Sequence, residues 1–495
     1  MATRAFTFLE RGDQRDVNLK GGMTTRPPVP AYSRLVLLLL VLFLPSCKPR
    51  STAEFITIKD PVIALTHIRV IDGTGTKARE DQTIIIDSGR IAAIGRTSEI
   101  SIPASATTLD LSGHTAMPGL VGMHNHLFYA MRGGDHYVDS PESFPPLYLA
   151  AGVTTIRTAG AMKLDTDRAV KMAIDEGKLA GPKIHISSPY INRHPSQTVD
   201  PQKITDLINK WAGESVTSLK VYENITGAEL GPMVEAAHKR GIKVTGHVCA
   251  MGFVEAAQAG IDNLEHGLAM DTEFFSDKKG GACPDRSYWL PELARIDVKS
   301  EPVQAMIREL VNRRVAVTGT LSILETFVKE KFQLDPRMQD VLSESALKDC
   351  RKDLEKGKAD PRWSRVWEAV LKKEMEFERE FVKAGGLLMS GVDPTGWGGV
   401  VAGYGDQRNL ELLVDAGFSP EEAIRIATLN GATFLGEDSR IGSLTAGKQA
   451  DIVIVRGNPA AKIADVRNVE LVFKDGVGYD PAKLIESIRG LVGKK

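Results

Sequence analysis

Residues 117–128 read MPGLVGMHNHLF, where a Pro-Gly turn leads into a short apolar run that ends on His124 and His126. Further short apolar runs follow along the chain, and helical stretches separate them. They are VTTIRTAG (153–160), KIHISSPY (183–190), SLKVYENI (218–225), KVTGHVCA (243–250), NLEHG (263–267), VAVTGTLS (315–322) and LLMSGVDP (387–394). Apolar strands that alternate with helices about eight times predict an α/β protein with a parallel (β/α)8 barrel.

Outside the expected barrel, the sequences near both ends of the chain contain mostly strand-like runs and few helical stretches. VIALTHIRVIDG at 62–73 and QTIIIDSGRIAAIG at 82–95 are strand-like runs with Gly turns, and QADIVIVRGNP at 449–459 repeats the pattern. We therefore expect a small composite β-sandwich domain from residues 62–117 and 440–495 around a barrel at 118–439. A charged block at about 330–383 predicts a helical insertion between strands seven and eight.

The N-terminal region carries an apolar run, LVLLLLVLFL at 35–44, that is far shorter than the roughly 20 residues of a membrane-spanning helix. Arg34 precedes this run, and Pro45, Ser46 and Cys47 follow it, which is the pattern of a secretory signal. The last residues resemble a bacterial lipobox. This predicts a signal peptide at 1–46, with Met23 as an alternative start, and a tether at 47–61. The mature protein is expected in the periplasm or on the outer membrane, with a lipid anchor at Cys47 as its only membrane attachment.

Composition excludes several classes of protein. Hydrophobic residues make up 42% and charged residues 25% of the 495 residues, as in an ordinary globular chain. The 62 Lys and Arg residues balance 63 Asp and Glu residues, so no basic excess is available to bind nucleic acid. Four cysteines are too few for a disulfide framework. Whether the chain forms a homo-oligomer is left open.

Polar side chains end several of the expected barrel strands, where the strands of such a barrel meet at the active-site mouth. Two of them form an HxH pair on one strand, so both imidazoles point the same way. A lysine is also present. As an ammonium it has no lone pair for a metal, so its functional interpretation is a neutral amine that has captured carbon dioxide to form a carbamate. The six positions are His124, His126, Lys220, His247, His266 and Asp393.

With these residues in this order, the chain resembles the amidohydrolase superfamily and its binuclear subtype with a carboxylated lysine. Stretches such as GDQRNLELLVDAGFSPEEAIRIATLNGATFLG at 405–436 are similar to the prolidase-like and imidazolonepropionase-related dipeptidase branch. The resemblance implies that His124, His126 and Asp393 hold one metal and that His247 and His266 hold the other. Carbamylated Lys220 and a hydroxide would bridge two divalent ions, with zinc favoured by nitrogen and oxygen ligands.

The resemblance also implies a reaction, the hydrolysis of an amide C–N bond by a dipeptidase, a carboxypeptidase or an N-acyl amino acid amidase. Asp393 would be the general base and acid, and the substrate would be a small molecule or a dipeptide. Tyr222 is similar to a substrate-binding tyrosine of the branch. Arg193 and His194, in the loop after the third strand, are candidates to bind a substrate carboxylate.

Other functions are weighed against this one. Ring opening of a cyclic amide, a lactone or an imidazolone on the same fold is the main alternative. A mononuclear deaminase typically lacks the lysine of strand four and pairs the strand-five histidine with an acidic residue, whereas this chain has Lys220 and Ala250. A surface lipoprotein without catalysis is disfavoured because all the ligand positions are intact.

Overall fold

The computed structural model describes residues 52–194 and 196–494. The expected signal peptide, the alternative start at Met23 and the lipid site at Cys47 lie outside these residues. Within the described part of the chain, no helix combines the length and the apolar character needed to cross a membrane.

Eight parallel strands form the barrel that the sequence predicts, and each strand pairs with the next in chain order. All six residues of the first strand and all six of the second are buried, as expected for strands covered on both faces. The strands are β7 (Leu120–Asn125), β10 (Val153–Thr158), β11 (Lys183–Ile191), β12 (Val216–Val221), β13 (Lys243–Gly246), β14 (Asn263–Glu265), β15 (Ala316–Gly319) and β16 (Leu388–Ser390).

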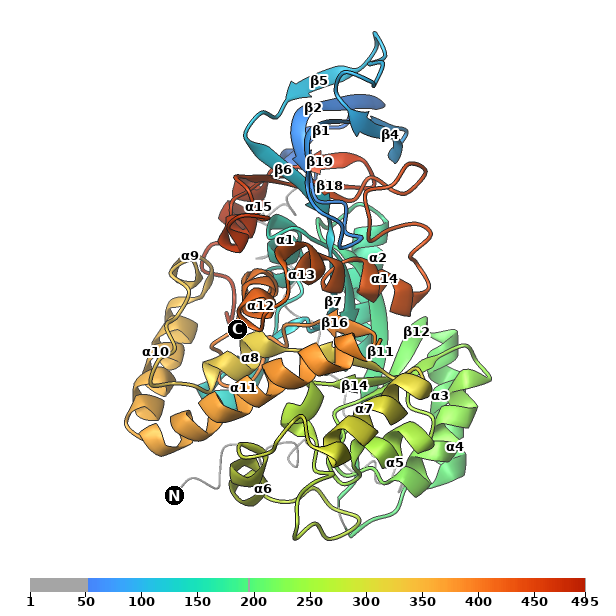
Figure 1. Cartoon of the computed structure of the whole chain (residues 1–495), viewed down its shortest axis with the longest axis vertical. Coiled ribbons are helices and arrows are strands. Elements are labelled where there is room, and N and C mark those ends of the chain that lie inside the picture. The colour runs from blue at the N-terminus through green and yellow to red at the C-terminus, as the bar shows by residue number, and fades with distance from the viewer. Residues whose placement is uncertain (1–51, 195, 495) are drawn as a thin grey trace, which may run out of the picture. The chain divides into compact units, whose positions relative to one another are not determined.

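A second sheet combines both ends of the chain, at the top of Figure 1. Its central pair is antiparallel, with Ile452 of β17 opposite Pro118 of β6. Alternating apolar residues from both ends bury one shared core, which includes Ile63, Ile84 and Ile454. The strands are β1 (Ile56–Ile58), β2 (Val62–Val70), β3 (Arg79–Asp87), β4 (Arg90–Arg96), β5 (Thr107–Asp110), β6 (His114–Pro118), β17 (Ile452–Arg456), β18 (Val469–Lys474) and β19 (Val477–Tyr479).

The structure differs from the expected tether over residues 56–58. These residues form β1, which pairs antiparallel with β19. Ile56 and Ile58 are half-buried while Thr57 between them is exposed. This alternation is that of an edge strand with one face on a core, so the folded part begins earlier than the sequence analysis placed it.

Helices surround the barrel, and most connect one barrel strand to the next (Figure 1). Some carry clear start signals, such as the reciprocal capping of Thr226 and Glu229 at α4. Two strands, β8 (Phe128–Met131) and β9 (His136–Asp139), form a separate hairpin. The helices are α1 (Phe144–Ala150), α2 (Leu164–Asp175), α3 (Pro201–Gly213), α4 (Gly227–His238), α5 (Phe253–Gln258), α6 (Arg286–Leu293), α7 (Glu301–Asn312), α8 (Leu321–Thr326), α9 (Met338–Val341), α10 (Glu344–Lys358), α11 (Pro361–Lys383), α12 (Tyr404–Asp415), α13 (Pro420–Ile426), α14 (Leu429–Leu435) and α15 (Pro481–Ser487).

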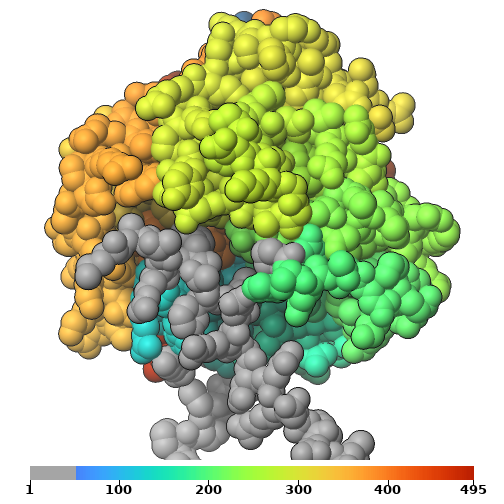
Figure 2. Space-filling view, turned by 90° about the horizontal axis from the view of Figure 1, so that it is seen from below, coloured from blue at the N-terminus to red at the C-terminus, as the bar shows by residue number. Residues whose placement is uncertain are grey.

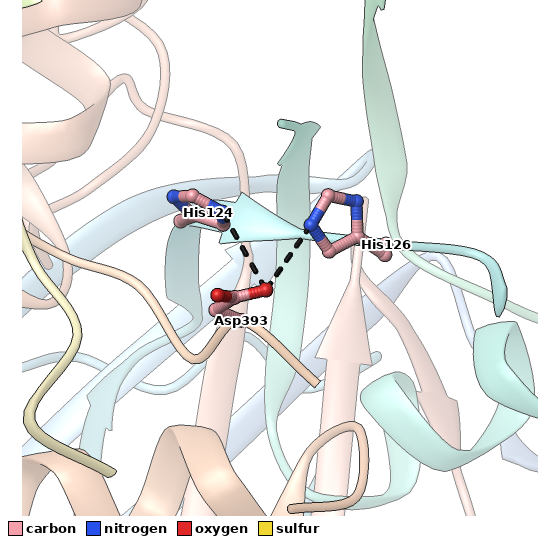
Figure 3. A group of neighbouring side chains, drawn as sticks. All are labelled: His124, His126 and Asp393. Carbon is pink, nitrogen blue, oxygen red and sulfur yellow. Dashed lines mark ion pairs between the residues drawn. The ribbon is translucent and has the colours of Figure 1, made fainter. Parts of the chain in front are cut away.

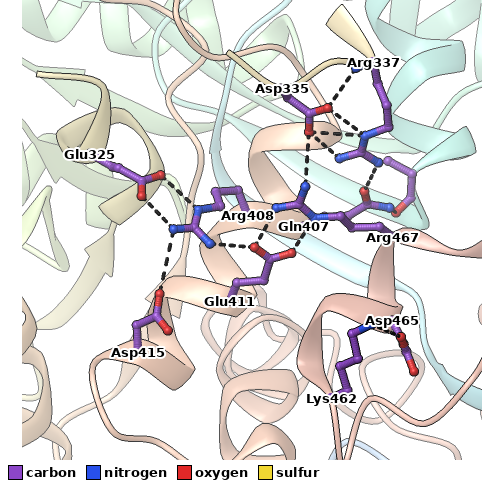
Figure 4. Close-up of polar contacts among 11 residues, drawn as sticks. Glu325, Asp335, Arg337, Gln407, Arg408, Glu411, Asp415, Lys462, Asp465 and Arg467 are labelled. Atoms are coloured by element: carbon purple, nitrogen blue, oxygen red, sulfur yellow. Dashed lines mark hydrogen bonds and ion pairs between the residues drawn. The ribbon is translucent and has the colours of Figure 1, made fainter. Parts of the chain in front are cut away.

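Helices α8 to α11 lie between barrel strands β15 and β16, and α9 to α11 fall within the range of about 330–383 that the sequence analysis gave for a helical insertion. Ion pairs attach its start to α12 and to the C-terminal region (Figure 4). Arg337 lies 2.7 Å from Asp335 and donates to Gln407 of α12 at 2.6 Å. Arg467 reaches the same Asp335 at 3.7 Å. Arg408 of α12 also pairs with Glu325 of α8 at 2.6 Å, so this helical region contacts both α12 and the C-terminal region through charged side chains.

Helix α11 brings two buried glutamates, Glu374 and Glu378, against two glycines of the barrel. A Cβ atom on Gly319 would lie 1.9 Å from Oε1 of Glu378, so the carboxyl of Glu378 packs directly against this glycine and would have to move if residue 319 had a side chain. Neither carboxyl oxygen of Glu378 has a hydrogen-bond partner among the described residues. Burial raises the pKa of Glu378 to about 8. The protonated, neutral carboxyl is thus the favoured form in the folded chain near neutral pH.

We expect the variant Glu378→Gln to be more stable than the wild type at alkaline pH. Because the folded pKa of Glu378 lies above its ordinary value of 4.5, its contribution to stability is complete below pH 4.5 and is lost as the pH rises to about 8. Glutamine stays neutral, so the gain should reach a few kcal/mol above that pH and vanish near pH 4.5, because each tenfold change in a protonation constant is worth about 1.4 kcal/mol. Thermal unfolding at pH 4.5 and pH 9 measures this, with Glu376→Gln on the same helix as control. An equal effect at both pH values would contradict the prediction.

Candidate metal centre

The predicted ligands gather at the carboxyl ends of the barrel strands. His124 and His126 come from the end of β7, and Asp393 follows β16. Oδ1 of Asp393 lies 3.6 Å from Nε2 of His124 and 3.3 Å from Nε2 of His126 (Figure 3). Among the described residues, these three form the one group of His, Cys, Asp or Glu residues whose ligand atoms all lie within 4.8 Å of one another. Two imidazoles and a carboxylate at this spacing can hold a divalent metal ion.

Backbone contacts between the last strand and the first place Asp393 beside the histidines. The amide of Asp393 donates to the carbonyl of His124 at 2.8 Å. Gly391 permits this approach, because a Cβ there would lie 2.4 Å from Cβ of His124. Asp393 and His266 both have a positive φ, 48° and 68°, a region that favours glycine. Such backbone strain is typical of functional sites, where the surrounding structure must hold it.

His266 and His247 extend the site from the ends of β14 and β13. Nδ1 of His266 lies 4.0 Å from Oδ2 of Asp393, and its ring lies 4.5 Å from the ring of His124. The ring of His247 stands 4.7 Å from that of His266. Burial lowers the pKa of both histidines well below the usual value and that of His124 to about 4. These imidazoles are therefore neutral near pH 7, as metal ligands must be.

Hydrogen bonds on one ring nitrogen leave the other nitrogen available in three of these histidines. Nδ1 of His124 contacts Glu265 at 2.7 Å, and Nδ1 of His266 contacts the hydroxyl of Thr320 at 2.8 Å. Nδ1 of His126 lies 3.3 Å from the carbonyl of Gly160. Partners of this kind fix the ring orientation and direct Nε2 towards a metal.

Lys220 lies on β12, another strand of the barrel, with only 1% of its surface exposed. Its Nζ atom has no hydrogen-bond partner among the described residues and lies 3.8 Å from Oε1 of Glu265. Burial lowers the pKa of the amine to about 8. A buried amine that makes no hydrogen bond is costly, and its lowered pKa makes it easier to neutralise. It therefore fits a group that completes a metal site better than a structural ion pair.

The sequence analysis did not identify Glu265 and Arg157. Glu265 contacts the candidate ligand His124, and Arg157 contacts Glu265. Oε2 of Glu265 contacts His124, and its Oε1 lies 2.8 Å from Nη2 of Arg157. Both side chains are completely buried. Glu265 directly precedes His266 in the stretch IDNLEH, and this position was the only sequence feature that could have indicated a role for Glu265. Its partners lie 108 and 141 residues away, so no local pattern reveals the contacts.

Of the three residues predicted to bind substrate, Tyr222 lies beside a candidate metal ligand, whereas Arg193 and His194 contact residues outside the ligand set. The ring of Tyr222 lies 4.8 Å from that of His247, and burial raises its pKa well above 10. Arg193 contacts other groups: its guanidinium lies 2.9 Å from Glu229 and donates to the carbonyl of Gly281. His194 is exposed and contacts Ser196 at 2.7 Å. The substrate roles of these residues stay predictions.

One disulfide bond lies beside the site, between Cys249 and Cys283. Cys249 follows His247 by two residues, and its pairing excludes it as a nucleophile. The sequence analysis expected no disulfide framework, and a single bond is not one, but neither the pairing nor its place was foreseen. Cys350 is a buried free cysteine.

We expect the variant Glu265→Gln to weaken metal binding about 10- to 100-fold, because groups that orient metal ligands have effects of this size. It should also destabilise the fold, because it leaves the charge of Arg157 buried without its partner. A titration with zinc in a competing chelator and thermal unfolding of the metal-free protein measure the two effects separately. Glu378→Gln, which changes a buried glutamate elsewhere, is the control for metal binding. Unchanged zinc affinity in Glu265→Gln would show that Glu265 does not orient a ligand.

A family model described as "Amidohydrolase family" matches residues 115–279 and 368–477, more than half of the chain. The chain belongs to the amidohydrolase family. The resemblance noted in the sequence is thus confirmed at the level of the family, whose members depend on metal ions, and the trio in Figure 3 is where this amidohydrolase could hold one.

Solved amidohydrolase structures agree with the fold. A protein assigned as a prolidase from Bifidobacterium longum is 24% identical, with 87% of this chain and 98% of that chain covered and a TM-score of 0.63. A Xaa-Pro dipeptidase with methionine bound in its active site is 20% identical, with coverage of 85% and 100% and a TM-score of 0.63. At these identities the likeness concerns the fold.

Curated relatives align only over part of their length. An imidazolonepropionase from Mycolicibacterium smegmatis is 30% identical over 110 residues, which are 22% of this chain and 26% of the relative. The aligned stretches cover 13% to 26% of the first three such relatives. These matches support the family and do not specify a substrate.

Proposed function

We propose that this amidohydrolase hydrolyses an amide C–N bond of a dipeptide or an N-acyl amino acid with two divalent metal ions. One observation carries the proposal. The buried amine of Lys220, which makes no hydrogen bond with the described residues, lies near three buried, neutral imidazoles and a carboxylate, all at one end of the barrel. A carbamate on Lys220 would supply two oxygens at the centre of this group, which suits a pair of ions bound by nitrogen and oxygen ligands.

We divide the candidate ligands between two positions, as the family resemblance implies. His124, His126 and Asp393 would hold one ion, His247 and His266 the other, and carboxylated Lys220 would contact both. Zinc is the preferred ion because the ligands are imidazoles and carboxylates without a thiolate. Bound divalent ions would acidify a water molecule and polarise the scissile carbonyl.

The side chains of the chain itself would guide the proton. Asp393 faces the space shared by the histidines, where a carboxylate can take the proton of the attacking water and pass it to the departing nitrogen. Tyr222 stays protonated because burial raises its pKa, so its hydroxyl can donate a hydrogen bond to a substrate oxygen. The proton transfer to nitrogen is needed because an amine leaves poorly unless it is protonated.

A screen of the metal-loaded protein against dipeptides and N-acyl amino acids tests this function, with a chelator and re-added zinc as controls. We expect release of a free amine that stops on chelation and returns with zinc. Full activity after thorough demetallation would contradict the proposal. Ring opening of a cyclic amide, a lactone or an imidazolone is the alternative, favoured by the local similarity to imidazolonepropionase. Cleavage of these substrates alone would select it.

We also propose that the protein is exported and anchored by a lipid at Cys47. The disulfide between Cys249 and Cys283 supports export, because such bonds persist in oxidising compartments. Mass spectrometry of the mature N-terminus tests the anchor, and an unmodified Cys47 would contradict it.

A further inference from the structure

Helix α11 packs against a short turn at residues 266–270, here called the His266 turn, which follows barrel strand β14. Figure 2 shows orange residues of the chain beside the yellow-green residues that come after this turn. The contact itself lies beneath that surface, because Glu374 of α11 and every residue of the His266 turn are buried. An acidic side chain in such a place calls for an explanation, since an ionisable group is costly to bury.

Glu374 contacts the backbone of the His266 turn at two points. Its Oε2 atom accepts a hydrogen bond from the amide of Ala269 at 2.7 Å. Its Oε1 atom packs against Gly267, where a Cβ would lie only 1.8 Å from it. Gly267 also has a φ of 61°, so this position combines a left-handed backbone with a close approach to the carboxyl. The side chain of Glu374 and the backbone of the turn therefore fit each other closely.

The His266 turn needs such support because its backbone is strained. The φ of His266 is 68°, in the left-handed region that residues other than glycine rarely adopt. A conformation of this kind persists only where the surrounding structure holds it. Strand β15 and the residue after it hold one side, since the amide of His266 donates to the carbonyl of Thr318 at 2.8 Å and its ring contacts the hydroxyl of Thr320. Glu374 holds the turn from the side of the helix.

We infer that Glu374 is a positioning residue that holds the His266 turn and thereby directs His266 towards its metal ion. The inference rests on the metal role of His266 in the proposed function, and it adds a residue that acts through the backbone without touching the ion or the substrate. Glutamine at this position has nearly the same size and keeps an oxygen that can accept from the amide of Ala269. Leucine has a similar size and no acceptor, so the two variants isolate the hydrogen bond.

Zinc titrations in a competing chelator compare Glu374→Leu with Glu374→Gln, at a temperature where both are fully folded. We expect Glu374→Leu to bind one zinc ion about 10- to 100-fold more weakly, because groups that orient a metal ligand have effects of this size. Glu374→Gln should stay close to the wild type. The absorption spectrum of the cobalt-loaded protein, which reports the ligand geometry, should change in Glu374→Leu alone.

The variant Glu378→Leu is the matched control. Glu378 lies one turn further along α11, is equally buried, and makes no hydrogen bond with the described residues. Its replacement removes a second buried carboxyl from the same helix and should leave the zinc affinity unchanged. Equal zinc affinity in Glu374→Leu and Glu378→Leu would overturn the inference. So would a Glu374→Gln variant that binds zinc as weakly as Glu374→Leu.

Hydrogen exchange of the metal-free proteins tests the same contact without turnover. The amide of Ala269 should exchange faster in Glu374→Leu than in the wild type or in Glu378→Leu, as measured by mass spectrometry of peptides that cover residues 264–272. If the exchange and the zinc affinity change as expected but no amide bond is cut, the proposed function fails and the positioning role stands. Exchange at the wild-type rate in Glu374→Leu would overturn that role.

Discussion

Replacement of Asp393 by asparagine should lower kcat/KM on amide substrates by about 10³-fold, since proton transfer by a positioned group contributes about 10²–10⁴-fold. Asparagine has nearly the same size, but it cannot accept the proton of the attacking water. Asp393 also stands 3.3 and 3.6 Å from two imidazoles, so the variant should bind zinc more weakly. Kinetics at saturating zinc separate the two effects, because the loss of kcat should persist there.

The variant Asp451→Asn is a suitable control for Asp393→Asn. Asp451 is buried and lies 2.6 Å from Lys183, the first residue of β11, at the opposite end of the barrel. Its replacement should leave kcat unchanged even if it lowers stability. If Asp393→Asn, saturated with zinc, kept wild-type kcat, then the proton would be carried by another group and the proposed role of Asp393 would be wrong.

Replacement of Lys220 by alanine should lower activity at least about 10²-fold. Loss of a group that merely orients a ligand costs about 10- to 100-fold, and Lys220 is expected to be the bridge itself. The removed amine leaves a cavity among buried imidazoles, so short carboxylic acids should restore part of the activity by filling it. The zinc content per chain, measured by elemental analysis, should fall with the activity and recover with the acid.

Lys183→Ala is the matched control for Lys220→Ala, since it removes another lysine of a barrel strand far from the site. Carbon dioxide provides an independent readout, because a carbamate on Lys220 adds a defined mass in an intact-protein spectrum recorded under mild conditions. A variant that keeps full activity and two zinc ions without added acid would show that no bridge at Lys220 is needed.

The barrel, and the position of the candidate ligands at the carboxyl ends of its strands, could be predicted because they depend on local patterns. Short apolar runs predicted the strands, and a polar residue at the end of a run predicted a position at the barrel mouth. His124, Lys220, His266 and Asp393 required no knowledge of contacts, since parallel strands bring their carboxyl ends together. The sheet built from both ends of the chain could be predicted for the same reason, because strand-like runs occur near both ends of the sequence.

The supporting contacts could not be predicted because they join residues that are distant in sequence. Glu265 pairs with Arg157 across 108 residues, and neither residue belongs to a pattern of strand ends. Arg286 likewise contacts His247 across 39 residues, and the disulfide joins Cys249 to Cys283 across 34 residues. A sequence shows which side chains can do chemistry, whereas the partners that orient them depend on packing between elements.

The sheet shared by both chain ends also constrains how the molecule is made. While the chain emerges from the ribosome, β6 exposes an open edge until β17 is synthesised more than three hundred residues later. An unpaired edge of this kind invites pairing with other chains. The sheet is therefore completed only when the last strands have been synthesised. Termination of translation just before β17 would leave an aggregation-prone product, even though every barrel strand had been made.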